Sequence, residues 1–374
     1  MTLMRIGLYL YSSRGGSGRY LWELAQALLR IAPKNEYFFY YDQQRTWWPR
    51  IRHARVHSRM FRYPLDRYEW AMQMALPMRL RRDRIDIFHS QAFQLPIQVP
   101  CPSVVAVHDA IPFTTPDRSL PPWRRRVVPQ KLRIAVQIAD HILVPSQHTR
   151  QALLRHVPFS AGKTTCVPLG CSPSFSPLLQ SRAQQIVRRR FRVKRPYFLS
   201  VGLLIPRKNY PCLIRAFRRR LRATTDLVIV GAPWWSGEEV FRLIRGDSTI
   251  HHLEGVSDEM LRVLYAGAEG LAYPSEDEGF GLPPLEAMSC GTPVIVARAA
   301  SLPEVVGKAA LFVKPGSVGE LAQALEAVRF DAPLRAKLRL RGLARVRRFT
   351  WDETASRTLQ VYENVLRRKR RFGA

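Results

Sequence analysis

The chain has 374 residues, 46% hydrophobic and 10% aromatic, a composition typical of a globular protein. One ordinary hydrophobic core does not extend over that length, so we expect two domains of roughly 150 to 200 residues. The 59 lysines and arginines outnumber the 29 acidic residues, and the resulting net charge of +30 predicts an anionic partner, either a membrane surface or a nucleic acid.

Two further properties exclude whole classes of protein. No apolar run reaches the roughly 18 residues that a membrane-spanning helix needs. The five cysteines have neither paired CxxC spacing nor the spacing of a metal site, which predicts free thiols in a reducing compartment. We therefore expect a cytoplasmic protein. An arginine-rich composition without any function is the alternative explanation of the charge.

Short apolar runs alternate with amphipathic stretches from the N-terminus, and this alternation predicts a parallel α/β sheet. In chain order we expect a strand at 5–11, a helix at 18–33, strands at 36–42, 85–90 and 103–109, and a helix within 125–146 that leads into another strand.

A glycine-rich segment, "SSRGGSGRY" (12–20), lies between the first strand and the first helix. It is neither GxGxxG nor a Walker sequence with its lysine, so it gives weak support for a dinucleotide or ATP site. Gly15 and Gly16 would still allow a ligand to approach the backbone closely. A simple tight turn is the alternative.

Histidines end two of the N-terminal strands. His108 and Asp109 stand at the carboxyl end of the strand at 103–109, and His89 ends the strand at 85–90. Ligands of parallel α/β folds bind at this end of the strands. Each histidine alone is equally well explained as a satisfied buried polar group.

A proline- and serine-rich stretch without periodicity, 168–177, predicts the linker between the domains. The alternation then begins again, with strands expected at 197–202, 226–231, 270–275 and 293–298. We therefore predict two tandem doubly wound domains, residues 1–173 and 174–354.

The first strand of the second domain is followed by "VGLLIPRKN" (201–209). Arg207 and Lys208 stand between a glycine at a strand end and the next helix, where two cations could bind a diphosphate. In so basic a chain an Arg-Lys pair is common and would not by itself indicate a diphosphate site. Its position after a glycine at a strand end is what favours that function.

A second loop, "EDEGFG" (276–281), follows the strand at 270–275 and leads into a short helix, "LPPLEAMSC". Gly279 and Gly281 would let backbone N–H groups approach an anion near a helix N-terminus. We place Glu286 in the first turn of that helix, facing the same cleft as Glu278. Each carboxylate can accept hydrogen bonds from a vicinal diol, so these glutamates would hold a ribose and a sugar. A dipole-stabilising Glu286 and a solvated Glu278 are the alternative.

Together these motifs resemble the retaining glycosyltransferases of family 4, whose GT-B fold consists of two Rossmann-like domains. Glu278 and Glu286, within "EGFGLPPLEAMSCGTPVI", match the family's Glu-x7-Glu signature. "RKN" is similar to its diphosphate-binding element, "GGSGRY" to its N-terminal glycine loop and "VHD" to its first-domain histidine. The resemblance covers nearly the whole chain, but Leu203 replaces an arginine that many members carry.

The resemblance implies transfer of a sugar from a nucleotide-diphosphate donor in a cleft between the domains, with no metal and no other cofactor. Arg207 and Lys208 would neutralise the departing diphosphate, Glu278 and His108 would contact the donor sugar, and Glu286 would hold the ribose. The remaining donor-binding residues would be Gly15, Gly16, Gly279, Phe280, Gly281 and Leu282. A C-terminal helix at about 355–370 would pack back on the first domain.

Among known branches, "LIPRKN" and "SLPEVVG" look most like bacterial mannosyltransferases, so GDP-mannose is the expected donor and a UDP- or dTDP-linked hexose the alternative. The acceptor would be a glycan or a lipid-linked glycan of a cell-surface polysaccharide. We expect a peripheral enzyme on the inner face of the cytoplasmic membrane, with Arg79, Arg81, Arg82, Arg84 and Arg124 to Arg126 toward anionic lipid.

Two rival functions stay open at this point. Another GT-B enzyme, such as a nucleotide-sugar epimerase or a phosphorylase, would share the fold and the donor motifs. A nucleic-acid-binding protein would account for the charge, but the basic clusters are spread over both halves without interleaved aromatic residues. We therefore expect no nucleic-acid partner.

Overall fold

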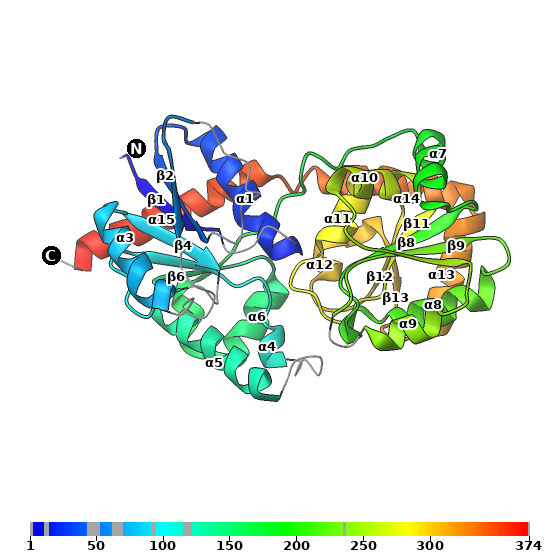
Figure 1. Cartoon of the computed structure of the whole chain (residues 1–374), viewed down its shortest axis with the longest axis horizontal. Helices are drawn as coiled ribbons and strands as arrows, with labels where there is room; N and C mark the ends of the chain where they lie inside the picture. Colours follow the sequence, from blue (N-terminus) through cyan, green and yellow to red (C-terminus); the bar gives the residue numbers. More distant parts are fainter. Residues whose placement is uncertain are drawn as a thin grey trace. The chain divides into compact units, whose positions relative to one another are not determined.

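The computed structural model describes residues 3–10, 15–42, 53–61, 70–91, 95–114, 122–234 and 237–372. They form two compact units, each built around its own sheet (Figure 1). Unit 1 takes the described residues of Met1–Pro116, Pro122–Gly170 and Trp351–Ala374, and unit 2 those of Cys171–Thr350. The chain thus enters unit 2 after Gly170, within the segment expected to be a linker, and returns to unit 1 at Trp351.

The sheet of unit 1 has seven strands in the order β3-β2-β1-β4-β5-β6-β7, all paired in parallel. Successive strands are added outward in both directions from β1 and β4, as in a Rossmann sheet, so the topological switch point lies between these two. The strands are β1 Arg5–Tyr9, β2 Glu36–Asp42, β3 Val56–Phe61, β4 Ile87–Gln91, β5 Ser103–Ala106, β6 His141–Val144 and β7 Thr164–Cys166.

Helices cover both faces of this sheet. On one face α1 and α15 pack together, and the Tyr37 hydroxyl of β2 donates to the carbonyl oxygens of Leu28 and Ala32 at the end of α1. On the other face, η2, α3, α5 and α6 share one apolar core with the strands. The helical segments are α1 Gly15–Ile31, η2 Ala71–Ala75, α3 Leu76–Arg82, α4 Ile111–Thr114, α5 Pro122–Ile138, α6 Gln147–His156, η4 Pro158–Lys163 and α15 Trp351–Phe372.

Unit 2 repeats the same topology with six parallel strands in the order β10-β9-β8-β11-β12-β13. Its switch point therefore lies between β8 and β11. The strands are β8 Tyr197–Val201, β9 Asp226–Val230, β10 Ile250–Leu253, β11 Gly270–Tyr273, β12 Val294–Ala297 and β13 Leu311–Val313.

Two apolar clusters fill the two faces of the second sheet. One includes side chains of α7, α10, α11 and α12, and the other side chains of α8, α9, α13 and α14. The segments are α7 Gln180–Phe191, η5 Pro206–Lys208, α8 Tyr210–Arg220, α9 Glu238–Ile244, α10 Asp258–Gly267, α11 Leu282–Ser289, α12 Leu302–Val306, η6 Gly307–Ala309, α13 Val318–Phe330 and α14 Ala332–Val346. The prediction of two doubly wound α/β units is confirmed.

The strands that sequence analysis did not predict are β3, β7, β10 and β13, which are the edges of the two sheets. Every interior strand was predicted, because a strand buried on both faces is a continuous apolar run, such as "DLVIV" in β9. An edge strand tolerates polar side chains, and "VHSRMF" in β3 or "IHHL" in β10 shows no such run. β13, "LFV", is apolar but only three residues long.

The C-terminal segment also differs from expectation. α15 extends from Trp351 to Phe372, so it is longer at both ends than the helix expected at about 355–370. All five cysteines are free thiols. Within the described ranges, no helix has the length and apolarity that a membrane crossing would need.

Candidate active site

Two loops of unit 2 meet at its topological switch point. β8 and β11 are neighbours in the sheet, and the loop after β8 carries Arg207 and Lys208 while the loop after β11 carries Glu278. Parallel strands place their carboxyl ends at one edge, and ligands of doubly wound sheets bind at that edge beside the switch point. Residues 70 positions apart in the chain therefore come into contact.

The first loop depends on two glycines of neighbouring strands. Gly202 has a φ of +148°, and a Cβ there would lie 3.0 Å from the Lys208 side chain. A Cβ on Gly231 would lie 1.9 Å from the Gly202 carbonyl oxygen, so no side chain fits at that position. The Tyr210 hydroxyl donates to the same carbonyl at 2.7 Å. This packing brings the backbone of β9 against the loop and leads the chain toward Lys208.

Hydrogen bonds join the two loops. The Glu276 amide donates to the Arg207 carbonyl at 2.9 Å, and the Asn209 side-chain amide donates to the Glu276 carboxylate at 2.8 Å. Asn209 has a φ of +54°, in the left-handed region, at the junction of η5 and α8. An asparagine tolerates this conformation better than most residues, which explains the third letter of "RKN".

One carboxylate oxygen collects the donors of both loops. Glu278 Oε1 lies 2.5 Å from Lys208 Nζ and 2.9 Å from Arg207 Nη1. The hydroxyls of Ser275 and Tyr273 donate to the same oxygen at 2.6 and 3.0 Å. Lys208 Nζ also donates to the Tyr273 hydroxyl. Among the described residues, none donates to the other oxygen, Oε2, which leaves one acceptor for a ligand hydroxyl.

The charges of this cluster determine its protonation. Burial alone would raise the pKa of Glu278, but Lys208 and Arg207 outweigh burial and lower it to about 2. Glu278 is therefore ionised at neutral pH although only 8% of it is exposed. Lys208 is equally buried, so the cluster brings two cations and one anion into a partly dehydrated site.

The loop at 276–281, here called the glutamate loop, packs against α12 and is hydrogen-bonded by Ser301, the N-cap of that helix. The Ser301 hydroxyl lies 2.8 Å from the carbonyl oxygens of both Glu278 and Phe280. Gly281 has a φ of +107°, and a Cβ there would come within 2.9 Å of Leu302. The Phe280 ring packs edge-to-face on Phe349, with 5.8 Å between the ring centroids. Leu282 then begins α11 with proline in its first turn, as expected.

Glu286 does not lie where sequence analysis placed it. α11 begins at Leu282 and has no acidic residue in its first turn, so Glu286 belongs to the second turn. It is 5% exposed, and the Tyr265 hydroxyl donates to its Oε2 at 3.0 Å. The predicted helix also began at Leu282, but a turn has only 3.6 residues, so Glu286, the fifth residue of the helix, lies just beyond the first turn. Its predicted role as the ribose ligand remains a prediction.

His89 and His108 lie in an aromatic cluster with side chains of α1 and α15. His89 is fully buried, with Nδ1 2.5 Å from the Tyr362 hydroxyl and Nε2 3.4 Å from the Tyr20 hydroxyl. The His108 ring packs edge-to-face on Tyr20, with 4.8 Å between centroids. Burial lowers the pKa of His89 to about 3 and that of His108 to about 4, so both rings are neutral at neutral pH.

The two histidines differ in their partners. His89 is a satisfied core residue that joins α15 to α1. The buried Nε2 atom of His108 has no hydrogen-bond partner in the described part of the chain. A neutral imidazole can donate or accept there according to its tautomer, so His108 is the histidine with capacity for a ligand. Asp109 accepts a hydrogen bond from the Ile111 amide at 3.1 Å and shapes the turn after it.

Gly15 and Gly16 lie in the first turn of α1 and not in a loop before it. Sequence analysis placed the start of this helix at residue 18 because glycine is a poor helix former. Residues 12–14, the beginning of the predicted loop, lie outside the described residues. The predicted ligand approach at the two glycines remains a prediction.

Sequence reasoning missed the hydroxyl groups that organise the site. Tyr273 and Ser275 flank the end of β11 and donate to Glu278, and Ser301 fixes the backbone of its loop. The first two could have been found, because they directly precede the glutamate loop at a strand end. Ser301 and the Tyr362 partner of His89 have no local signal, since each acts across a long stretch of chain.

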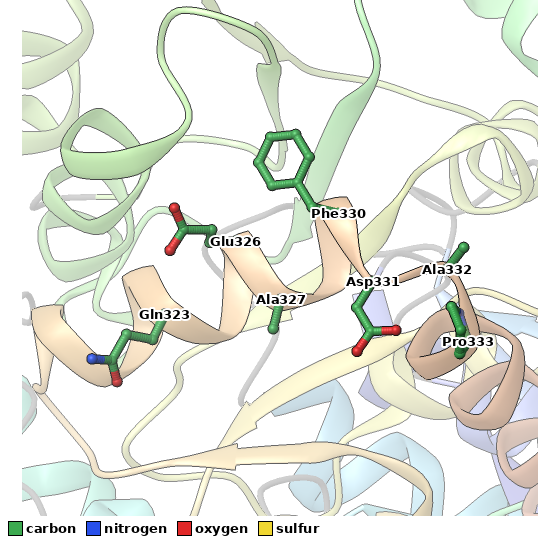
Figure 2. A pocket seen from close by; sticks show the side chains of 7 residues that line it. All are labelled: Gln323, Glu326, Ala327, Phe330, Asp331, Ala332 and Pro333. Atoms are coloured by element: carbon green, nitrogen blue, oxygen red, sulfur yellow. The ribbon is translucent and has the colours of Figure 1, made fainter.

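A hollow elsewhere in unit 2 is not a site of this kind. It has a volume of about 680 Å³ and lies at the junction of α13 and α14, where Figure 2 shows Phe330 and Glu326 on the same helix. Glu326 pairs with Arg220, and Asp331 caps α14 by accepting from the Leu334 amide. Its polar groups serve local structure, so the switch point of unit 2 remains the candidate site.

Comparisons with known proteins agree with this geometry. Residues 14–175 match the model of the Glycosyltransferase Family 4 domain, and residues 181–344 match that of the group 1 glycosyl transferases. The chain is 32% identical to O-antigen chain mannosyltransferase B of Escherichia coli over 83% of each chain.

Solved structures share the fold across nearly the whole chain. Sucrose-phosphate synthase of Thermosynechococcus elongatus has a TM-score of 0.78 at 22% identity, covering 97% of this chain and 99% of that one. Alr3699/HepE of Anabaena, solved in complex with UDP and glucose, has a TM-score of 0.75 at 16% identity, covering 96% and 99%. This likeness shows the fold and agrees with the expected GT-B architecture of two α/β units.

Proposed function

The chain belongs to the family 4 glycosyltransferases, and on this basis we propose that it transfers mannose from GDP-mannose, with retention of the anomeric configuration. The acceptor is a glycan or lipid-linked glycan of a cell-surface polysaccharide. Support for mannose comes from the relative named O-antigen chain mannosyltransferase B. UDP-linked hexose is the second candidate, supported by the UDP and glucose in the structure of Alr3699/HepE.

The single observation that carries the proposal is the contact of Arg207 and Lys208 with Glu278 at the switch point of unit 2. Two cations can neutralise the charge that develops on a departing nucleoside diphosphate. Glu278 keeps them in place before the donor binds, and its Oε2 is left to accept a sugar hydroxyl. This pairing explains why a cationic diphosphate site also needs a buried glutamate.

The other residues have supporting roles in the proposal. Glu286 accepts the ribose hydroxyls, the backbone amides of the glutamate loop bind the diphosphate, and His108 contacts the donor sugar through its Nε2. Leaving-group charge is stabilised by side chains and backbone, so the proposed reaction needs no metal ion. Transfer that persists in excess EDTA would agree with this, and transfer restored only by Mg²⁺ or Mn²⁺ would contradict it.

We further propose that the enzyme works at the inner face of the cytoplasmic membrane. The net charge of +30 favours an anionic surface, and a lipid-linked acceptor is presented there.

Nucleotide binding and product analysis test the donor together. We expect GDP to raise the melting temperature of the protein more than UDP at equal concentration, because binding to the native state stabilises it by about 2.7 kcal/mol at 100 times Kd. Incubation of GDP-mannose with acceptor should release GDP. Stabilisation by UDP and not GDP would select the second candidate. Donor epimerisation without acceptor, or a requirement for inorganic phosphate, would replace transfer by another GT-B reaction.

A further inference from the structure

Large apolar side chains are exposed along one helical segment of unit 1. Trp70, Met74 and Met78 follow one another at intervals of four residues and are 56%, 53% and 57% exposed. Residues four apart lie on the same side of a helix. Ile97, 63% exposed, lies beside them, because its amide donates to the Gln73 side chain at 2.8 Å. The opposite side of the segment is buried in the core through Met72, among others.

A second helix of the same layer has a similar outer side. On α5, Trp123 is 59%, Val127 39% and Ile134 46% exposed. The inner side chains of α5 and of η2 with α3 belong to one apolar cluster against one face of the sheet. Both helices therefore present their outer sides away from the same sheet face (Figure 1). We call these outward residues the docking face: Trp70, Met74, Met78, Ile97, Trp123, Val127 and Ile134.

Basic residues accompany the apolar ones and acidic residues do not. Residues 70–82 and 122–138 contain no aspartate or glutamate. Exposed arginines and a lysine stand on the same two segments, namely Arg79, Arg81, Arg82, Arg125, Arg126, Lys131 and Arg133. Asp83, which directly follows the first segment, is buried and accepts hydrogen bonds from Arg59 and from the Tyr40 hydroxyl. The charged side chains within these two segments are therefore all basic.

Exposed apolar and basic side chains on the same helices indicate what kind of surface binds to the docking face. A helix that faces only water does not expose two tryptophans and two methionines. A protein interface is also enriched in tryptophan, methionine and arginine, but its centre is depleted of charge, whereas here seven exposed basic residues stand on the same two segments as the apolar ones. An amphipathic helix at a lipid surface carries tryptophan and long apolar side chains together with arginine and lysine, whose heads reach anionic headgroups. We propose that the docking face inserts its apolar side chains among the headgroups of an anionic membrane, with the surrounding arginines on the lipid phosphates.

The inference rests on, and deepens, the proposed function at the membrane. It assigns membrane attachment to side chains that enter the lipid, in addition to the general charge of the chain. It places attachment in unit 1, whereas the cationic diphosphate cluster lies in unit 2, so the two can be tested apart.

Co-sedimentation of the full chain with vesicles tests the docking face. We expect binding to equimolar phosphatidylcholine and phosphatidylglycerol at physiological salt, and little binding to phosphatidylcholine alone. Met74→Gln with Met78→Gln keeps helix-forming residues of similar size and should weaken vesicle binding about tenfold, since the apolar insertion is lost. Leu340→Gln, at a site 69% exposed on α14 of unit 2, is the matched control and should leave binding unchanged.

A second pair of variants separates insertion from charge. Arg81→Gln with Arg82→Gln should also weaken binding and reduce its salt dependence. Arg188→Gln with Arg189→Gln, the same change on α7 of unit 2, should have little effect. The inference is overturned if both arginine variants lose vesicle binding equally and the methionine variant loses none. That result would mean that the overall charge of the chain attracts it to the vesicles. A dimer in light scattering that the methionine variant abolishes, without vesicle binding, would make a second copy the occupant and also overturn it.

Nucleotide binding distinguishes these failures from a failure of the proposed function. The methionine variant should retain the melting-temperature shift with GDP, because none of its changes lies in unit 2. Loss of vesicle binding with that shift preserved is the result we expect. If the parent protein binds vesicles but GDP does not change its melting temperature, the docking face is supported and GDP-mannose is contradicted as the donor.

Discussion

Lys208 shows how one residue depends on its surroundings. It is 8% exposed, and its ammonium group lies 4.5 Å from the centroid of the Tyr273 ring as well as on Glu278. A buried charge of this kind persists only when it is paired, so Lys208 and Glu278 stabilise each other's ionised form. A diphosphate would contact Lys208 while the lysine is already paired with Glu278. The cation is therefore in place before the donor binds.

Replacing this lysine tests the site at the residue scale. Lys208→Ala should reduce the rate of sugar transfer by well over tenfold, on the order of 3 kcal/mol of transition-state stabilisation. Glu286→Ala should reduce it similarly if Glu286 holds the ribose. Lys308→Ala, at an exposed lysine of the same unit, is the control. Full transfer activity in a folded Lys208→Ala protein would remove the lysine from the mechanism.

His141 makes a prediction about acid stability. Its Nε2 lies 2.8 Å from the Thr165 hydroxyl, and burial, aided by the charges of Arg368 and Lys163, lowers its pKa to about 4. The unfolded chain, with a histidine pKa near 6.5, takes up the proton first as the pH falls. Stability is therefore lost between about pH 6.5 and 4, by at most about 1.4 kcal/mol per pH unit for this group.

His141→Gln should make that dependence shallower. The measurement is the free energy of unfolding in urea at several values between pH 5 and 7. The pKa values of His89 and His108 are also lowered by burial, so the free energy of unfolding of the variant still depends on pH in part. A variant with the slope of the parent protein would show that His141 is not protonated on unfolding in this range.

At the scale of elements, the switch point of unit 2 depends on how closely β9 approaches the loop after β8. The contact of Gly231 with the Gly202 carbonyl leaves no room for any side chain. It also determines where the loop can go, and thus where Arg207 and Lys208 lie. Sequence analysis noted neither glycine as a site residue, because their function is purely steric.

Gly231→Ala should therefore destabilise unit 2 by about 2 kcal/mol or more and weaken nucleotide binding, since the loop must move. Gly319→Ala is the matched control. It lies in α13, where an added Cβ meets nothing within 4 Å, and should be neutral or stabilising by up to about 1 kcal/mol. Thermal unfolding with and without GDP measures both effects. If the two variants are equally stable, the loop after β8 can move away from the added Cβ without a loss in the free energy of unfolding.

At the scale of the whole molecule, the charge of +30 acts on folding as well as on partners. Like charges repel more strongly in the compact state than in the unfolded chain. Individual ion pairs, such as Arg218 with Asp247 at 3.0 Å, act in the opposite sense. With twice as many basic as acidic residues, repulsion should dominate at low salt.

Salt should therefore raise the melting temperature. Between about 0.01 and 0.15 M salt the Debye length falls from about 30 to about 8 Å, which screens distant repulsion while leaving close pairs largely intact. Arg188→Gln with Arg189→Gln should reduce this response because it lowers the net charge. A melting temperature that falls steadily with added sodium chloride would show that ion pairs outweigh the repulsion.

By itself, the sequence determined the interior strands of both sheets, the Arg-Lys pair, the glutamate loop and the family. These are local signals, since an apolar run or a glycine loop at a strand end can be recognised within about ten residues. Only the tertiary structure decided the edge strands, because an edge strand is stabilised by its neighbour and not by its own apolar run. It alone joined Lys208 to Glu278, which meet because parallel strands bring their carboxyl ends to one edge of the sheet. It also joined His89 to Tyr362, which meet because α15 returns to unit 1 and packs on α1.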